Sequence, residues 1–424
     1  MLVIKNIVEN PEFVIERLSL RNIDARAIVN EIIDLDATRR KFQKETDDLK
    51  ADLNTGSRLI GDYMKVGKNQ EAEELRQNSL LLKSKIKESE DASGRIDQLL
   101  TEKVISLPNL PYTLVAPGKD ADDNVEVRAG GVMPELNESA LPHWDLAKKY
   151  DIIDFELGAK ITGAGFPVYK NKGAKLQRAL INFFLDEAEK AGYIEMQPPV
   201  LVNEASGYGT GQLPDKEAQM YVAGLDNLYL IPTAEVPITN LYRDVIVDVE
   251  DLPIKNVAYT PCFRREAGTY GKDVKGLNRL HQFDKVEIVQ VAHPEKSYNT
   301  LEMMVLHVEG LVKKLGLPYR ILRLCGGDMG FTSAMTYDFE VYSAAQQRWL
   351  EVSSVSNFET FQANRLKLRF KDKLDKKTQL AHTLNGSALA LPRIMAALLE
   401  NNQTPEGIVI PEVLHKYINF TLIN

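Results

Sequence analysis

Residues 26–104 contain no proline and carry a heptad-like repeat, which limits the possible folds more than any other feature of the chain. Mostly apolar residues recur at alternating intervals of four and three, the spacing that turns one side of a helix toward a partner helix. Lys65–Asn69, centred on Gly67, is typical of a turn. We predict an antiparallel hairpin of two helices, each of about 35 residues and roughly 50 Å long. The predicted seam contains Ile28, Ile32, Leu35, Arg39, Phe42, Thr46, Leu49, Leu53, Gly56 and Ile60, then Ala72, Leu75, Ser79, Leu82, Ile86, Ser89, Ser93, Ile96 and Leu100.

A narrow apolar seam is enough for two helices but not for a globular core. The hairpin is therefore a coiled-coil spacer or dimerisation arm, or else a rod that binds a long, shaped partner. Lysines near the predicted tip and on the second helix are candidates for phosphate contacts. These lysines are Lys65, Lys68, Lys83, Lys85 and Lys87.

The remaining composition is that of an ordinary globular protein of two or three domains. The chain has 424 residues, a net charge of -8 and only two cysteines, Cys262 and Cys325. We expect no disulfide framework, zinc site or spanning helix, and a reducing, cytoplasmic setting. The Pro-, Asp- and Gly-rich stretch within residues 107–150 predicts a linker. We place a domain boundary near residue 110, giving domains 1–110, with the hairpin at about 27–103, and 111–424.

The C-terminal two thirds mix helical and strand patterns. An amphipathic helix is predicted at Lys175–Ala191, ending at Gly192, and another at Ser297–Leu315. His382–Gln403 predicts a strand, a small-residue turn and an apolar helix. Hairpin-length connections favour an antiparallel sheet flanked by helices, an α+β fold. The predicted strands are 193–202, broken by prolines, and Tyr229–Pro232, Val257–Phe263, Phe283–Val291, Tyr319–Leu324, Tyr337–Tyr342 and Trp349–Ser354.

Two of these strands, around Phe263–Glu287, have an unusually charged face. Residues of the same parity share one face of a strand. Arg264 and Glu266 therefore point one way, and Phe283, Lys285 and Glu287 point one way on the second strand. An apolar core does not tolerate such a mixture. The face is either a solvated outer surface or a binding site.

The residues of this strand pair, FRREAG and then GLNRLHQFDKVE, resemble motif 2 of the class II aminoacyl-tRNA synthetases. The segment from Gly192 to Pro199 resembles motif 1, and Asn385–Ser387 through Arg393 resembles motif 3. The segments at Gly209–Pro214, Thr233–Glu235, Gly327–Val341 and Glu351–Arg365 resemble the seryl-tRNA synthetase family in its bacterial type. The resemblance covers essentially the whole chain. It implies a class II synthetase-like sheet, a cytoplasmic homodimer, and no zinc.

The same resemblance assigns an ATP site. Arg264 would bridge the serine carboxylate and the α-phosphate, a task suited to a planar guanidinium, and Arg393 would hold the γ-phosphate; these two are the catalytic residues. Glu266 would accept from the adenine amino group and Phe283 would stack on the ring. The metal would be Mg²⁺, held by Glu351 and Ser354. The full ATP set is Arg264, Arg265, Glu266, Leu280, Phe283, Glu351, Val352, Ser353, Ser354 and Arg393.

The implied serine pocket must hold an ammonium and a hydroxyl. Glu287 would pair with the ammonium, and a site that hydrogen-bonds the hydroxyl rejects analogues lacking it. The implied pocket residues are Thr233, Ala234, Glu235, Arg264, Glu287, Asn385 and Ser387.

The implied reaction is ATP-dependent activation of L-serine to seryl-adenylate and transfer to the 3′ end of serine tRNA, and of selenocysteine tRNA where one is present. The hairpin would grip the long variable arm of the tRNA by shape and backbone contact. The sequence departs from the family pattern at Arg265, Asn364 and Ala388, which bears on ATP affinity and loop detail.

Two other enzymes and two non-enzymes remain as alternatives. A class II ligase could load a different amino acid, or could load a carrier protein, which would lack the hairpin. A binding protein that had lost catalysis should have lost Arg264, Glu287, Glu351 or Arg393, and all four are present. A purely structural coiled-coil protein leaves the charged strand face unexplained.

Overall fold

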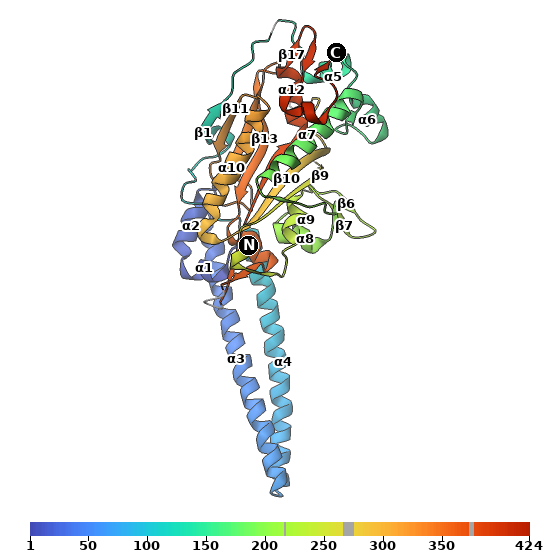
Figure 1. Cartoon of the computed structure of the whole chain (residues 1–424). Helices are drawn as coiled ribbons and strands as arrows, with labels where there is room; N and C mark the ends of the chain where they lie inside the picture. The colour runs from blue at the N-terminus through green and yellow to red at the C-terminus, as the bar shows by residue number, and fades with distance from the viewer. Residues whose placement is uncertain (137, 216–217, 266–274, 373–376) are drawn as a thin grey trace. The chain divides into compact units, whose positions relative to one another are not determined.

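The computed structural model in Figure 1 describes residues 1–136, 138–215, 218–265, 275–372 and 377–424. The chain divides into two compact units. The smaller consists of residues 2–19 and 23–108, and the larger of Met1, residues 20–22 and residues 109–424. Among the described residues, no helix combines the length and the apolar character needed to cross a membrane.

The smaller unit is dominated by two long helices that pack side by side (Figure 1), α3 (Arg26–Lys65) and α4 (Asn69–Ser106). They contain 40 and 38 residues, so each is roughly 60 Å long. Gly67 lies in the turn between them with a φ of +77°, a conformation that glycine adopts at little cost. All the predicted seam residues are buried or half-buried. The predicted hairpin is therefore confirmed, and its helices are slightly longer than expected.

The seam of the hairpin includes polar contacts that the heptad pattern did not specify. Thr46 and Ser89 share a buried hydrogen bond of 2.8 Å between the two helices. Asp36 is buried and forms ion pairs with Arg39 and Arg40. Two short helices, α1 (Ile4–Glu9) and α2 (Pro11–Ser19), pack against α3 and widen the apolar contact at its N-terminal end. A two-helix seam needs such a cap, because it buries little apolar surface by itself.

The larger unit is built on an eight-stranded sheet in the order β1-β11-β12-β13-β16-β10-β9-β4. Neighbouring strands are antiparallel except for the edge pair β4 and β9, which is parallel. The predicted antiparallel sheet of an α+β fold is thus confirmed. The strands are β1 (Val125–Gly130), β11 (Tyr319–Arg323), β12 (Met335–Ser343), β13 (Arg348–Asn357), β16 (His382–Ala390), β10 (Gln282–Ala292), β9 (Ile254–Phe263) and β4 (Ile194–Glu195).

Three helices cover one face of this sheet: α7 (Asn171–Lys190), α10 (Ser297–Lys314) and α12 (Leu391–Asn401). Their buried residues form one apolar core with inward-facing strand residues such as Ile288, Phe339 and Leu384. Because side chains alternate along a strand, the neighbouring residues Glu287 and Asn385 point to the opposite face. The helices thus fix which side of the sheet is left for polar side chains.

Short helices and ribbons complete the larger unit. The helix α9 packs against the face of the sheet opposite α7, through Ala234 and Ile238 against Ala258 and Val289. The short helices are α5 (His143–Lys149), α6 (Phe155–Ile161), α8 (Glu204–Thr210), α9 (Glu235–Asn240) and α11 (Thr360–Leu366). The small sheets are β2 (Ile153–Asp154) with β3 (Val168–Tyr169); β5 (Leu201–Val202), β7 (Leu228–Leu230) and β6 (Val222–Ala223); β15 (Thr378–Leu380), β14 (Arg369–Lys371) and β8 (Ile246–Asp248); and β17 (Gln403–Thr404), β18 (Gly407–Val409) and β19 (Leu422–Ile423).

Three differences between the structure and the sequence prediction concern the main sheet and its neighbours. The predicted linker contains an edge strand, β1, and a helix, α5. Both are too short for their hydrophobic residues to show a clear periodicity. The prolines Pro198 and Pro199 split one predicted strand into β4 and β5, because proline has no N–H to donate. The turn expected after His382 is absent, and β16 continues to Ala390, where α12 begins directly.

Candidate functional site

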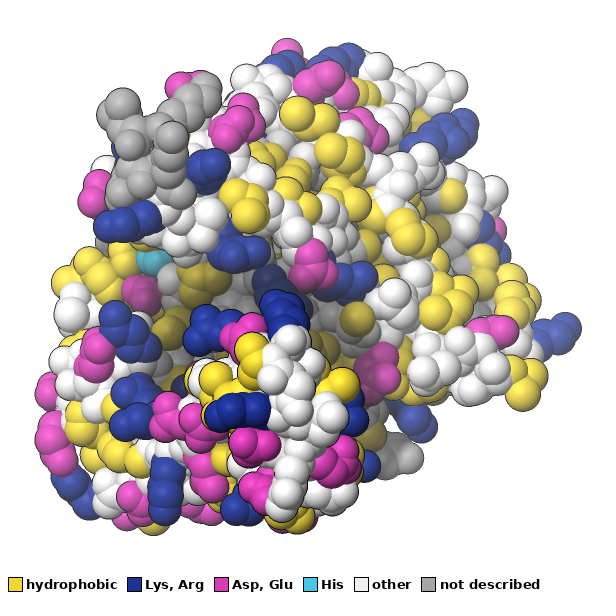
Figure 2. Space-filling model, turned by 90° about the horizontal axis from the view of Figure 1, so that it is seen from below, with side chains coloured by type: hydrophobic (Ala, Val, Ile, Leu, Met, Phe, Trp, Pro, Cys, Tyr) yellow, Lys and Arg dark blue, Asp and Glu magenta, His cyan; other side chains and the backbone are white. Residues whose placement is uncertain are grey.

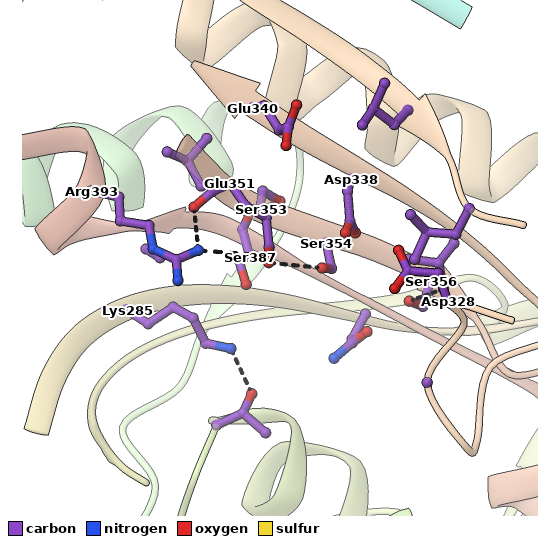
Figure 3. A pocket seen from close by; sticks show the side chains of 18 of the residues that line it. Lys285, Asp328, Asp338, Glu340, Glu351, Ser353, Ser354, Ser356, Ser387 and Arg393 are labelled. Atoms are coloured by element: carbon purple, nitrogen blue, oxygen red, sulfur yellow. Dashed lines mark hydrogen bonds and ion pairs between the residues drawn. The ribbon is translucent and has the colours of Figure 1, made fainter. Parts of the chain in front are cut away.

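A pocket of about 890 Å³ opens on the polar face of the sheet (Figure 3). Its volume lies in the range of small-molecule sites. Its lining combines residues as distant in sequence as Thr233 and Arg393. Most of the residues predicted for serine and ATP line it together: Thr233, Glu235, Arg264, Leu280, Phe283, Glu287, Glu351, Val352, Ser353, Ser354, Asn385, Ser387 and Arg393.

Three predicted site residues are not part of this lining. Ala234 is buried, and it packs with Ile238 against Ala258 and Val289 of the sheet. The guanidinium of Arg265 lies 5.8 Å from the centre of the Tyr221 ring. Glu266 lies outside the described residues. The roles predicted for these three residues stay predictions.

Arg264 and Phe283 form one wall of the pocket. Arg264 follows β9 directly, and its N–H donates to the carbonyl of His281 at 2.9 Å. In the β9–β10 ladder Phe283 lies opposite Cys262, so Arg264 falls on the same face as Phe283. The guanidinium carbon lies 5.3 Å from the centre of the Phe283 ring. This wall offers a flat apolar surface beside a fixed positive charge.

The end of the pocket near β10 and β16 is a dense network around Glu287. The Glu287 carboxylate lies 2.5 Å from Nζ of Lys285 and accepts from Thr233 at 3.2 Å and from Asn385 at 3.0 Å. Lys285 also donates to the Thr233 hydroxyl at 3.0 Å. Both charged side chains are almost fully buried. A buried ion pair is tolerated only with such complete hydrogen bonding.

Glu235 adds a second carboxyl group to this end. Gln362 donates to its Oε1 at 2.5 Å, and Thr383 in turn donates to Gln362 at 2.7 Å. Burial, followed by the charge of Glu287, raises the pKa of Glu235 to about 7, against the opposing influence of Gln362. The charges of Lys285 and Arg264 also lower this pKa, but burial and Glu287 outweigh them. The arrangement suits a ligand that carries an ammonium group.

Arg393 lies near the other end, at the start of α12. Its Nε donates to the Asn278 carbonyl at 3.0 Å, and Nη1 donates to the Glu351 carbonyl at 2.8 Å. Its guanidinium also lies 3.6 Å from the Glu351 carboxylate. The N-terminal end of a helix adds further positive potential. The Arg393 guanidinium and the N-terminal end of α12 thus both add positive potential to the same part of the pocket.

An oxygen-rich cluster lies beside Arg393, where β12 pairs with β13 (Figure 3). Ser354 donates to Glu351 at 3.5 Å, and Asp338 lies directly across from Ser354. Burial and then the charge of Glu351 raise the pKa of Asp338 well above its usual range. Its buried Oδ1 has no hydrogen-bond partner. This unpartnered oxygen beside Glu351 and Ser354 fits a hard divalent cation. Across the described ranges, however, no cluster of three or more His, Cys, Asp or Glu side chains is arranged to hold a metal.

The comparison with known proteins agrees with this geometry. Residues 1–111 match the model of the seryl-tRNA synthetase N-terminal domain. Residues 222–402 match the tRNA synthetase class II core domain (G, H, P, S and T). A serine–tRNA ligase of Salinibacter ruber is 49% identical over 100% of this chain and 99% of its own length. This chain belongs to the seryl-tRNA synthetase family.

Solved structures extend the relationship within the seryl-tRNA synthetase family. The structure of seryl-tRNA synthetase from Pyrococcus horikoshii complexed with ATP is 36% identical and has a TM-score of 0.93, covering 100% of this chain and 99% of that chain. The cytoplasmic serine–tRNA ligase from Naegleria fowleri in complex with AMP is 26% identical, with a TM-score of 0.88 and coverage of 100% and 98%. The fold is therefore shared over the whole length.

Several residues that line the pocket of this family member, or contact its lining, were not assigned a role from the sequence. Lys285 shares a strand face with Phe283 and Glu287, so its parity was a usable signal. Asp338 and Glu340 on β12 likewise have the same parity, and both line the pocket. Gln362 lies on α11, and nothing in its local sequence indicates that it contacts Glu235. Only the tertiary structure could identify it.

The lysines predicted to contact tRNA lie on the hairpin of the smaller unit, and all five are exposed. Lys65 lies 3.5 Å from Asp62, and Lys68 lies 3.8 Å from Glu71. On α4, Lys83 and Lys87 are one turn apart, whereas Lys85 lies about 160° around the helix from Lys83. On the face shown in Figure 2, basic and acidic side chains are intermixed. Lys83 and Lys87 thus form a pair, and Lys85 faces elsewhere.

Proposed function

We propose that this chain is a serine–tRNA ligase. It activates L-serine with ATP to form seryl-adenylate and transfers the seryl group to the 3′ end of serine tRNA, and of selenocysteine tRNA where one is present. The observation that carries the proposal is one pocket with two buried carboxyl groups at one end and Arg264 and Arg393 farther along. The similarity to the Salinibacter serine–tRNA ligase and to the Pyrococcus seryl-tRNA synthetase complexed with ATP supports the choice of serine and of ATP.

Serine binds with its ammonium group toward Glu287 and Glu235. Both carboxyl groups are held by neighbours, so they are oriented before the ligand arrives. The serine hydroxyl takes hydrogen bonds from polar groups at this end, including Thr233, Asn385 and Ser387. An analogue without the hydroxyl would leave these buried groups unsatisfied, and threonine would have to be excluded by volume.

ATP occupies the part of the pocket between Phe283 and Arg393. The adenine ring stacks on Phe283, with Leu280 and the backbone of Val352 and Ser353 beside it and Glu266 and Arg265 as further contacts. A serine carboxylate oxygen attacks the α-phosphorus, and the bond to pyrophosphate breaks. Arg264 bridges the two anions, and Arg393 holds the γ-phosphate. Fixed cations that meet charge as it develops are the main catalytic device in such a step.

Mg²⁺ would be held by Glu351 and Ser354, with Asp338 close by. When bound, the ion neutralises phosphate charge. Two carboxylates and a hydroxyl leave positions for phosphate oxygens, which is how Mg²⁺ is usually bound beside nucleotides. Glu351 also contacts Arg393, so the protein orients the nucleotide through both charges.

We propose domain 1–110 as the tRNA-binding domain and 111–424 as the catalytic domain. The hairpin would contact the tRNA backbone through Lys65, Lys68, Lys83, Lys85 and Lys87. A homodimer is proposed from the motif 1 resemblance and from β4, an edge strand with an exposed Ile194. A cytoplasmic location fits the two unpaired cysteines.

The test is amino-acid-dependent exchange of pyrophosphate into ATP, measured with each of the twenty amino acids and without tRNA. Exchange with serine alone is expected, followed by charging of serine tRNA. Exchange with a different amino acid would overturn the substrate assignment. No exchange with any amino acid, with or without tRNA, would overturn the enzymatic function.

A further inference from the structure

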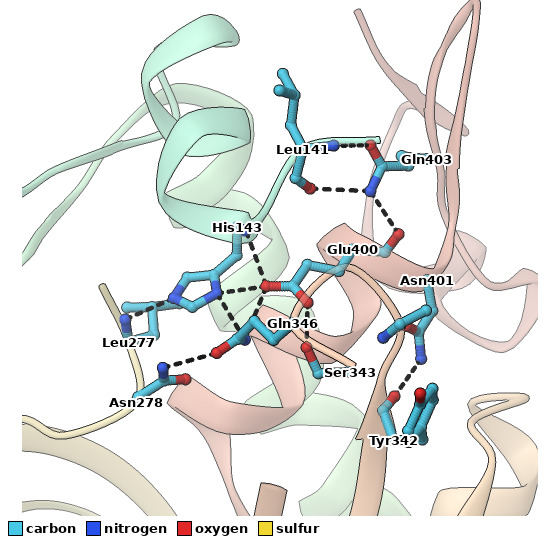
Figure 4. Close-up of polar contacts among 11 residues, drawn as sticks. Leu141, His143, Leu277, Asn278, Tyr342, Ser343, Gln346, Glu400, Asn401 and Gln403 are labelled. Carbon is cyan, nitrogen blue, oxygen red and sulfur yellow. Dashed lines mark hydrogen bonds and ion pairs between the residues drawn. The ribbon is translucent and has the colours of Figure 1, made fainter. Parts of the chain in front are cut away.

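A buried histidine lies outside the pocket and touches the segment that leads into β10. His143 begins α5 and is fully buried, as is its partner Glu400 at the end of α12. Figure 4 shows the imidazole ring between Glu400 and Leu277. Its Nδ1 lies 2.7 Å from Oε1 of Glu400, and its Nε2 lies 2.8 Å from the Leu277 nitrogen.

These two contacts determine the tautomer. The Leu277 N–H can only donate, so Nε2 of His143 must accept and carries no proton. The proton is therefore on Nδ1, which donates to Glu400. Burial by itself would raise the pKa of Glu400, but the hydrogen bonds from His143 and Ser343 outweigh it and hold the pKa below its usual value. His143 thus links the Glu400 carboxylate to the Leu277 backbone through its two ring nitrogens.

The neighbouring chain fits closely over the imidazole ring. Gly276 has a φ of +68°, and a Cβ added there would lie 2.2 Å from Nε2 of His143. The preceding residue, Lys275, has its Nζ over the Trp144 ring, 4.6 Å from the ring centre. The segment 275–277 is thus fastened to the first two residues of α5.

The same network reaches Arg393 of the pocket. Gln346 donates to Glu400 at 2.9 Å and accepts from the Asn278 side chain at 2.9 Å. The Asn278 carbonyl accepts from Nε of Arg393 at 3.0 Å. Arg393 and Glu400 are seven residues apart on α12, and therefore on the same side of the helix. Two residues on one side of α12 thus hold the segment 277–278. Glu400 acts through His143 and Gln346, and Arg393 acts directly.

We propose that His143 is a positioning residue for the ATP site: with Glu400 and Gln346 it fixes the Leu277–Asn278 backbone so that the Asn278 carbonyl orients Arg393. This inference rests on the proposed function, since it assigns Arg393 to ATP. It predicts an effect on the ATP end and not on the serine end, because Glu287, Glu235 and their partners make none of these contacts.

The experiment compares His143→Asn, His143→Gln and Gly276→Ala in the full chain, by serine-dependent pyrophosphate exchange with ATP and serine varied separately. Asparagine keeps a donor for Glu400 but loses the acceptor for Leu277, whereas the longer glutamine places an acceptor near the position of Nε2. We expect His143→Asn to raise the KM for ATP about tenfold, the effect of one lost buried hydrogen bond, with the KM for serine within twofold of the unmodified chain. His143→Gln should have a KM for ATP close to that of the unmodified chain. His382→Asn, at another buried histidine outside the pocket, should show no selective rise for ATP.

An unchanged KM for ATP, or equal rises for ATP and serine, would overturn the inference. If the His143 variants do not fold, Gly276→Ala decides, because it pushes on the same contact from the half-buried segment and should also raise the KM for ATP selectively. Calorimetric titration with ATP alone separates the two proposals. Weaker ATP binding by His143→Asn supports the positioning role even where the unmodified chain shows no serine-dependent exchange.

Discussion

The hairpin and the pocket are organised in opposite ways. The hairpin is formed by two helices that are adjacent in sequence, and its seam can be followed along one repeat from Ile28 to Leu100. The pocket is lined by residues of β10, β11, β12, β13, β16 and α12 and by Arg264 after β9, and these segments span more than a hundred residues of sequence. A local repeat can be changed piece by piece, whereas a pocket formed by distant strands depends on the whole sheet. A change in the hairpin and a change in the pocket should therefore impair different activities of the protein.

The largest effect is expected from Arg264→Ala, which acts on the pocket and leaves the hairpin intact. Loss of the cation between the two anions should lower kcat/KM for serine-dependent exchange by at least about a thousandfold. The helical circular dichroism and the Tm should stay close to those of the unmodified chain. Arg264→Lys is the matched control, and it should recover little because an ammonium lacks the planar fork. Exchange at the unmodified rate would contradict the role given to Arg264.

Removal of residues 30–100, replaced by a short Gly/Ser linker, makes the complementary change. Exchange should stay within a few-fold, because every residue of the pocket lies outside the deleted segment. Charging of serine tRNA should fall by at least about a hundredfold, since the proposed phosphate contacts are lost. Both rates are measured on the same preparation. Loss of exchange as well as charging would show that the hairpin supports the fold of the catalytic unit, and the separation described above would be wrong.

A smaller effect concerns pH and tests the serine end alone. Because the pKa of Glu235 is raised to about 7, the ionised fraction falls about tenfold between pH 8 and pH 6. An ammonium ligand prefers the ionised form, so the KM for serine should rise by about that factor as the pH falls. Glu235→Gln should bind serine more weakly and show a flatter profile. Equal pH profiles for the variant and the unmodified chain would contradict this assignment.

Without serine, the same carboxyl group should make the folded state less stable as the pH rises. A carboxyl group whose pKa is raised on folding binds its proton more tightly in the folded state. The free energy of unfolding should therefore decrease as the pH rises from about 4.5 to 7, by up to about 3 kcal/mol. Urea unfolding of the unmodified chain and of Glu235→Gln at several pH values isolates this contribution.

The smallest effect is expected on the hairpin surface. Lys83→Gln with Lys87→Gln should raise the KM for tRNA a few-fold and reduce its dependence on salt, because two neighbouring phosphate contacts would be lost. Lys85→Gln, on another side of α4, is the control for the loss of one charge. Exchange should be unaffected in both variants. Equal effects per lysine would mean that the tRNA does not distinguish the sides of this helix.

The sequence predicted the hairpin well because its information is local. The residues that face the partner helix are also those that repeat along the chain, from Ile32 to Leu100. Strand parity likewise predicted which side chains of β10 share a face, since alternation is a property of any strand. For the pocket, the resemblance to a known family named residues that the structure then brought together, although their roles remain proposals.

The features that were missed depend on contacts between distant segments. The strand β1 is short and mostly exposed, and it is held in place by its pairing with β11. The helix α5 is only seven residues long, yet its first residue is fully buried against α12 and the segment before β10. Gln362 touches Glu235 from a helix more than a hundred residues away. No local pattern contains these partners.

The pairing of β10 with β16 gives the pocket residues a second consequence. Glu287 lies opposite Ser387, and Asn385, two residues along the neighbouring strand, donates to it diagonally. If β10 shifted by one residue, Glu287 and Lys285 would turn toward the apolar helices α7 and α12. Their charges would then be buried without partners, which is far more costly than a lost apolar contact. The groups proposed to recognise serine therefore also serve as a register lock, and a chain that can bind its substrate has already paired these two strands correctly.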